Sequence, residues 1–202
     1  MKTERVQAFS DGVFAVAITL LVLDLSPPAV NSGHLLAALA DRWPDFAAFA
    51  LSFFTIGIIW VNHHVVFDAL VRVDRPLLFL NLGLLMSVVL LPFSTSLFAR
   101  FLISGGEESG VAAALFSGSL LLMSVWFDAA YAWIGAHPGL RSSGKAPPVS
   151  IQSLLRFGAG IVLYAACVGI AFVSAVAVLV ITALVAVYYM VDQVTTHVAP
   201  EG

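Results

Sequence analysis

The chain has 202 residues, of which 60% are hydrophobic and 10% charged, and its formal net charge is -3. With a mean hydropathy of +1.00, it has too little polar surface to coat a water-soluble domain, so its main solvent is predicted to be the lipid bilayer. Basic residues are scattered, which excludes a nucleic-acid-binding surface. The single cysteine, Cys167, excludes an internal disulfide and a cysteine-based metal site.

Six apolar segments are predicted to form transmembrane helices, because a helix needs about 20 mostly apolar residues to cross a bilayer. They cover residues 6–25, 45–67, 77–101, 111–134, 151–171 and 174–191. The last two come from one apolar stretch about twice the required length. The sequence therefore predicts an all-α, polytopic membrane protein, with residues 1–202 forming a single six-helix transmembrane domain.

The basic residues also predict an orientation, because cytoplasmic loops collect Lys and Arg. With both termini cytoplasmic, only Arg42 and Arg100 lie in outer segments. The inner segments hold Lys2, Arg5, Arg72, Arg75, Arg141, Lys145 and Arg156. We therefore expect a multi-pass protein of the cell membrane with both termini in the cytoplasm.

Polar residues interrupt the first three predicted spans at one membrane depth. Ser10 and Asp11 lie in the first span, His63 and His64 in the second, and Asn81 in the third. Ionisable groups are costly inside a bilayer and need a partner or water, so these residues are expected to form a hydrogen-bonded network between helices. Such a network either joins the helices or takes part in gating or permeation, and the residues alone leave both roles open.

Other chemistry has little support in the sequence. Neighbouring residues on a helix point about 100° apart, so His63 and His64 do not form a metal clamp. Asp24 and Asp128 lie near helix ends, where water and lipid headgroups can reach them. No nucleophile motif or phosphate-binding loop is present, so we expect no enzymatic activity, no cofactor and no structural metal.

The first predicted helix has two different faces. With Val16 as the origin and about 100° per residue, Gly12, Thr19, Leu20 and Leu23 fall within about 60° of it. These five residues are called the stripe. Ser10 and Asp11 fall near 120° and 220° on the same scale, turned away from the stripe. An apolar face on a membrane helix by itself indicates contact with lipid or with another helix.

The segment that begins Arg5-Val6-Gln7-Ala8-Phe9-Ser10-Asp11 and continues through Leu21 resembles the first-helix signature of the transmembrane protein 175 family of potassium channels. The Arg-x-x-x-Phe-Ser-Asp motif is that family's hallmark. Further matches are Trp60-x-Asn62-His63-His64 in the second span, and Asn81 with Leu91-Pro92-Phe93 in the third.

The resemblance implies a potassium-selective channel made of four identical six-helix subunits in the membrane, with potassium as the permeant ion. It implies that the first helices line a central pore, that Val16, Leu20 and Leu23 form an apolar constriction, and that Thr19 places a hydroxyl beside it. Arg5 would lie at the cytoplasmic mouth. The chain has no carbonyl filter sequence of the ordinary potassium-channel kind.

A second function fits the same polar residues. Intramembrane carboxylates and imidazoles can pass protons, so Asp11 with His63 or His64 could serve a proton-coupled transporter as a relay. Transporters commonly have inverted repeats and interrupted helices, and neither is visible in this sequence. The channel is therefore the favoured hypothesis.

Overall fold

The computed structural model describes residues 2–28, 34–142 and 151–198; in the last range, side chains are described for residues 158–191. Apart from one isolated bridge between Leu70 and Arg141, all regular structure in these ranges is helical. The α-helices are α1 (Thr3–Leu20), α2 (Leu35–Ala40), α3 (Trp43–Asp68), α4 (Arg75–Phe101), α5 (Gly106–Ala136), α6 (Ile151–Ile170) and α7 (Ala175–Val198). Two short 3-10 helices are η1 (Leu21–Asp24) and η2 (Pro138–Leu140).

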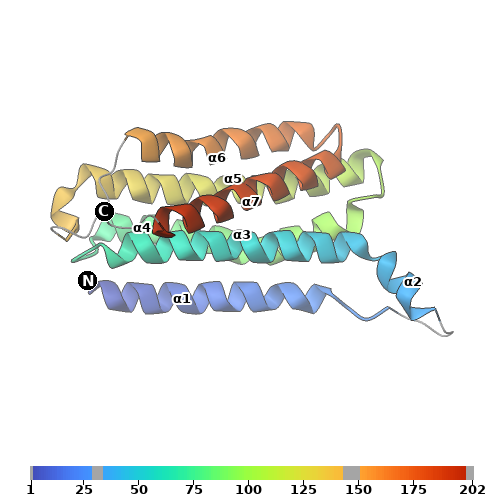
Figure 1. The fold of residues 1–202 in the computed structure, drawn as a ribbon, viewed down its shortest axis with the longest axis horizontal. Helices are drawn as coiled ribbons and strands as arrows, with labels where there is room; N and C mark the ends of the chain where they lie inside the picture. Colours follow the sequence, from blue (N-terminus) through green and yellow to red (C-terminus); the bar gives the residue numbers. More distant parts are fainter. Residues whose placement is uncertain (1, 29–33, 143–150, 199–202) are drawn as a thin grey trace.

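The long helices lie side by side as a bundle, and α1 begins at the same end at which α7 ends (Figure 1). Four segments are long and apolar enough to cross a membrane: α1 with η1, α3, α4 and α5. The apolar stretches described in α6 and α7 are shorter, Gly158–Ile170 and Ala175–Val191. The chain is therefore a multi-pass membrane protein.

The described residues contain a seventh α-helix, α2, where the sequence analysis expected only a connection. Its six residues, LLAALA, are far too few to span a bilayer. A search for spans of about 20 residues cannot detect so short a helix. In Figure 1, α2 lies beyond the end of the bundle, between α1 and α3.

Local sequence fixes where the helices begin and end. Asp74 caps α4, because its Oδ1 accepts a hydrogen bond from the backbone N–H of Leu77 at 3.0 Å. Gly105 and Gly106 connect α4 to α5 with φ of 72° and 67°, a conformation that residues with a Cβ rarely adopt. Ser174 caps α7 by accepting from the N–H of Ala177 at 3.1 Å.

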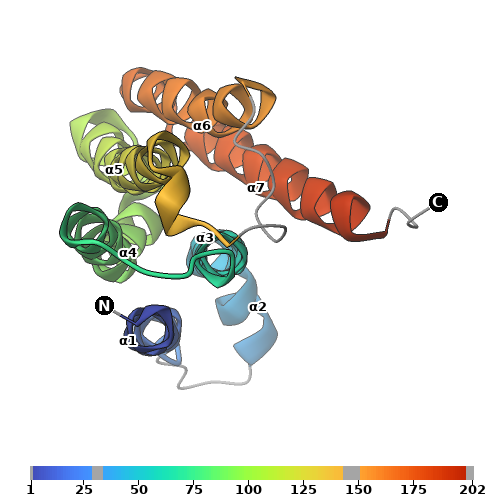
Figure 2. The same cartoon turned by 90° about the vertical axis from the view of Figure 1, so that its left-hand side faces the viewer.

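The helices α4 and α5 form the most extensive contact in the bundle. Phe98 and Phe116 stack with their ring centroids 4.6 Å apart. Gly83 lies so close to the indole of Trp126 that a Cβ at position 83 would stand 2.5 Å from a ring carbon. Figure 2 shows α1 on the side of the bundle away from α5 and α6, packed against α3 and α4.

Candidate functional site

One face of α1 is buried and the opposite face is open. The buried residues are Val6, Ser10, Phe14 and Ala17, which face α3 and α4. The stripe lies on the open face: Val16 is 56% exposed, Leu20 40% and Leu23 71%, and Gly12 and Thr19 are also exposed. On the single chain, the face of α1 that lies away from its neighbours is therefore apolar.

The end of the stripe has a different geometry from the rest of it. Leu23 belongs to η1, and a 3-10 helix turns by about 120° per residue. This tighter turn brings Leu23 nearly above Leu20, whereas an α-helix would place it about 60° away. Thr19 donates its hydroxyl to the carbonyl oxygen of Val16 at 2.9 Å, so only the lone pairs of the hydroxyl oxygen remain available on the open side.

Behind the stripe, Asn81 of α4 joins three helices. Its Oδ1 lies 2.8 Å from His63 Nε2 on α3, and its Nδ2 donates to the hydroxyl oxygen of Ser10 on α1 at 3.0 Å. All three side chains are buried. Because a carboxamide oxygen only accepts, His63 donates from Nε2 in this orientation of the amide. We call Ser10, His63 and Asn81 the buried network.

Aromatic rings hold His63 in this position. Its imidazole stacks on Phe67 with centroids 4.1 Å apart and meets the edge of Phe14 at 5.5 Å. Its Nδ1 is buried without a hydrogen-bond partner. The rings leave the imidazole little freedom to rotate, so the bond to Asn81 has a fixed direction and fixes the height of α4 against α3.

Asp11 lies outside the buried network. Its Oδ1 accepts a hydrogen bond from Trp60 Nε1 at 2.8 Å, and the Trp60 ring lies 6.1 Å from the exposed ring of His64. The sequence predicts a direct hydrogen bond between Asp11 and a histidine or Asn81. The structure pairs it with an indole, because Asp11 is about 100° around the helix from Ser10 and faces a different side of α3.

The remaining residues of the signature lie at the end of the bundle where α1 begins. Arg5 is exposed on α1. Phe9 is also exposed and lines a groove of about 320 Å³ with Phe79 and Leu82 of α4. Neither Arg5 nor Phe9 is hydrogen-bonded to the buried network. At this end, Thr3 donates its hydroxyl to the carbonyl oxygen of Leu70 at 3.3 Å.

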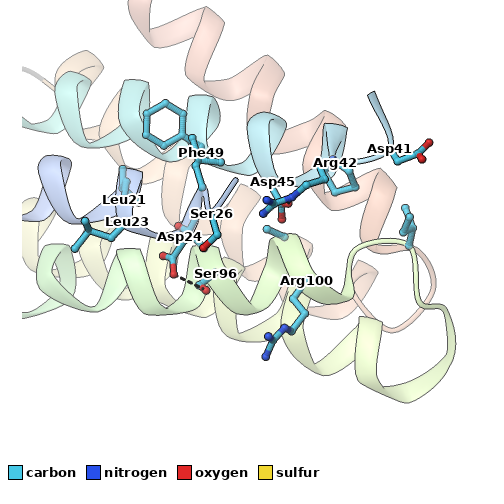
Figure 3. Close-up of a pocket in the computed structure, with 15 residues that line it drawn as sticks. Leu21, Leu23, Asp24, Ser26, Asp41, Arg42, Asp45, Phe49, Ser96 and Arg100 are labelled. Carbon is cyan, nitrogen blue, oxygen red and sulfur yellow. Dashed lines mark hydrogen bonds and ion pairs between the residues drawn. The ribbon is translucent and has the colours of Figure 1, made fainter. Parts of the chain in front are cut away.

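A second polar attachment holds the opposite end of α1. Asp24 at the end of η1 accepts a hydrogen bond from the Ser96 hydroxyl of α4 at 3.0 Å. The bond lies beside a cavity of about 550 Å³ formed where α1 ends and α3 begins (Figure 3). The position of Asp24 near a helix end was predicted from the sequence, but its partner was not, because Ser96 is 72 residues away along the chain.

Comparisons with known proteins agree with this arrangement. Residues 5–92 match the family described as "Endosomal/lysosomal potassium channel TMEM175". The chain is 44% identical over 191 residues to a potassium channel of Streptomyces collinus, with 94% of this chain and 92% of that relative covered. The chain belongs to the TMEM175 family.

Two further TMEM175 proteins extend the comparison. A crystal structure of a lysosomal potassium-selective channel TMEM175 homolog from Chamaesiphon minutus is similar with a TM-score of 0.78 at 32% identity, covering 94% of this chain and 97% of that one. The human endosomal/lysosomal proton channel TMEM175 is 32% identical over 200 residues. That alignment covers 88% of this chain and 40% of the human protein.

The region that matches the TMEM175 family contains the central part of the candidate site. The stripe, the buried network and the Asp11–Trp60 bond all fall within residues 5–92. Trp60 was part of the sequence match, but its bond to Asp11 was not predicted. The sequence feature that could have predicted this bond is the position of Trp60 three residues before His63, which places the two side chains on adjoining faces of α3. Among the described residues, no three His, Cys, Asp or Glu side chains gather as a metal site.

Proposed function

We propose that this chain is the subunit of a potassium-selective channel, with four copies arranged around a central axis and α1 of each copy lining the pore. The observation that carries the proposal is the open, apolar stripe on a helix whose opposite face is attached by a buried hydrogen bond between Asn81 and Ser10. In a cyclic assembly the same face of every subunit meets the axis. Four stripes then form one ring.

In this proposal the constriction consists of Val16, Leu20 and Leu23, with Thr19 beside it. An apolar ring cannot replace the water around an ion, so an ion must lose part of its hydration shell to pass. Potassium holds its water less tightly than sodium, so the ring penalises sodium more. The same ring can close the pore when water leaves it.

The proposed channel lies in the cell membrane with both termini in the cytoplasm and six crossings per subunit. The distribution of basic residues supports this orientation. The start of α1 and the end of α7 lie at the same end of the bundle (Figure 1), which agrees with an even number of crossings. The short helix α2 would then lie at the outer surface.

A proton relay through Asp11 and His63 or His64 is the rival function, and the hydrogen bonds favour it less. Asp11 accepts a hydrogen bond from Trp60. An indole N–H is only a hydrogen-bond donor, so Trp60 cannot take up a proton and pass it on. His63 is bonded to Asn81, whose carboxamide is not a protonatable carrier. The hydrogen bonds of the structure therefore give no continuous relay between Asp11 and either histidine.

The decisive experiment records single channels of the purified full-length protein in a planar bilayer, with potassium on one side and sodium on the other. The wild type should show a reversal potential that favours potassium. Leu20→Ala and Leu23→Ala should shift that potential toward zero while current persists, because a wider ring lets sodium keep more water.

The matched control is Ile18→Ala on the same helix. Ile18 is half-buried and packs against the hydrophobic core of its own chain, so its replacement should leave the reversal potential at the wild-type value. Proton current without potassium current in the wild type would favour the relay. An Ile18 variant that loses selectivity while both leucine variants keep it would show that another face of α1 lines the pore.

A further inference from the structure

The cavity at the end of α1 lies directly beside the last residue of the stripe. Its lining includes Leu23 and Asp24 of η1, Ser96 of α4, and residues from the start of α3. The volume of about 550 Å³ is large enough for many water molecules. In the proposed channel this cavity would adjoin the outer mouth of the pore.

The cavity keeps a net negative charge, because three of its lining residues are acidic (Asp24, Asp41 and Asp45) and two are basic (Arg42 and Arg100). Asp45 forms an ion pair with Arg42, with Nε and Oδ2 2.7 Å apart, so this pair contributes little net charge. Arg100 also lines the cavity, and its side chain extends across α4, away from Arg42 and Asp45 (Figure 3). Asp41 lies at the outer edge of the cavity and adds a second carboxylate.

The Asp24 carboxylate is also held in place. Ser96 donates its hydroxyl to Oδ1 at 3.0 Å, and a hydroxyl donor positions the carboxylate without adding an opposite charge. The end of α1 carries the negative end of the helix dipole, which adds to the negative potential here. Asp24 directly follows Leu23 in the chain, so their Cα atoms are about 4 Å apart and the carboxylate belongs to the residue next to the last residue of the stripe.

We propose that Asp24 raises the local potassium concentration at the outer mouth of the channel, and that Ser96 is the positioning residue that holds its carboxylate there. This inference rests on the proposed channel function and adds a charged residue to the apolar pore lining. Four copies would place four carboxylates around the mouth. Fixed negative charge at a pore entrance increases the supply of cations and leaves the discrimination between them to the constriction.

Ionic strength separates this role from one in selectivity. The screening length is about 30 Å at 0.01 M salt and about 3 Å at 1 M. In roughly 10 mM potassium, Asp24→Asn should therefore lower the single-channel inward current roughly two- to tenfold. Near 1 M potassium the variant and the wild type should conduct equally, and the reversal potential should be the same at every concentration.

Three further variants test which end of the pore the charge acts on and whether the Ser96 hydrogen bond positions it. Asp68→Asn removes an exposed carboxylate at the opposite end of α3, so it should not lower the inward current. Ser96→Ala keeps the charge of Asp24 but removes its hydrogen bond, and should give a smaller loss at low salt. Ser96→Thr, which restores a hydroxyl, should recover the wild-type current.

A cysteine variant separates the effect of the charge from a defect in assembly, because the charge is restored on channels that have already assembled. Asp24→Cys should conduct poorly at low salt and regain inward current after modification with a negatively charged thiol reagent, but not with a positively charged one. Cys167 is buried, so the wild type should not respond. Equal currents for wild type and Asp24→Asn at low salt, or equal effects of both reagents, would overturn the role of Asp24. A wild type without potassium current would instead overturn the channel itself.

Discussion

The α4–α5 pair and α1 are attached to the molecule in different ways. The pair α4–α5 is held by close apolar packing, with stacked Phe98 and Phe116 and the contact of Gly83 with Trp126. The helix α1 packs chiefly against α3 and α4, with Ser10 buried and Asp11 half-buried on the side that meets them. Ser10 accepts a hydrogen bond from Asn81, and Asp11 accepts one from Trp60.

The difference teaches how a membrane protein leaves an apolar face open. Lipid is as apolar as a leucine side chain, so burial of apolar surface gives little drive for helices to associate. Close packing and hydrogen bonds must hold the helices together instead. The pair α4–α5 is held together mainly by close packing. The helix α1 is held by hydrogen bonds as well, and this leaves the stripe of α1 free to face other copies of the chain.

The largest expected effect tests the pair α4–α5. Gly83→Val places carbon atoms where the Trp126 ring stands, and overpacking of this kind costs about 1–3 kcal/mol or more. We expect a strong loss of folded protein and a large decrease in the midpoint of thermal unfolding in detergent. Gly169→Val on α6 is the control, because a Cβ there meets nothing within 4 Å. Equal midpoints for the two variants would contradict the close approach of α4 and α5.

A smaller but specific effect is expected from the buried network. Asn81→Ala removes both bonds to His63 and Ser10. Ser10 can turn its hydroxyl to a carbonyl of its own helix, so the cost falls mainly on His63, at about 1–3 kcal/mol for an unpaired buried group. Thermal unfolding should shift accordingly, and the yield of the oligomer on size-exclusion chromatography should fall.

Asn62→Ala is the matched control for this prediction. Asn62 lies one residue before His63 but donates to the carbonyl oxygen of Ile58 in its own helix at 3.0 Å. Its loss therefore removes no bond between helices, and the oligomer yield should remain at the wild-type level. Asn81→Ala with wild-type stability and oligomer yield would show that α1 is held by apolar packing alone.

The smallest effect on stability is expected from the hydrogen bond between Asp11 and Trp60. Asp11→Asn keeps an oxygen that can accept the Trp60 hydrogen bond, so the unfolding free energy should change by less than about 0.5 kcal/mol. Asp11→Ala removes the acceptor and should cost more, about 1 kcal/mol. The two variants can be compared by thermal unfolding monitored through tryptophan fluorescence. A larger loss for the Asn variant would mean that the charge, rather than the hydrogen bond, holds α1.

Much of the fold was readable from hydropathy and turn residues. The helices α1, α3, α4 and α5 overlap the first four predicted apolar segments, and the chain breaks between α6 and α7 around Phe172–Ser174. A helix in lipid must satisfy its backbone hydrogen bonds within itself, so a long apolar segment almost dictates its own structure. The short helix α2 was missed because its six residues resemble any apolar turn of a loop.

The candidate site was only partly readable. Helical periodicity separated the stripe from Ser10 and Asp11, because a face depends only on the spacing of residues within one helix. Periodicity does not predict hydrogen-bond partners on other helices. The bonds from Asn81 to Ser10, from Trp60 to Asp11 and from Ser96 to Asp24 were therefore not predicted.

The sequence by itself determined that this is an α-helical membrane protein, which residues share a face of α1, and which family signature that helix carries. The tertiary structure decided the partners of the polar groups, the closeness of α4 and α5 at Gly83, and the cavity beside Asp24. The physical reason is that a partner depends on the relative rotation and height of two helices. Those are set by the packing of many side chains at once.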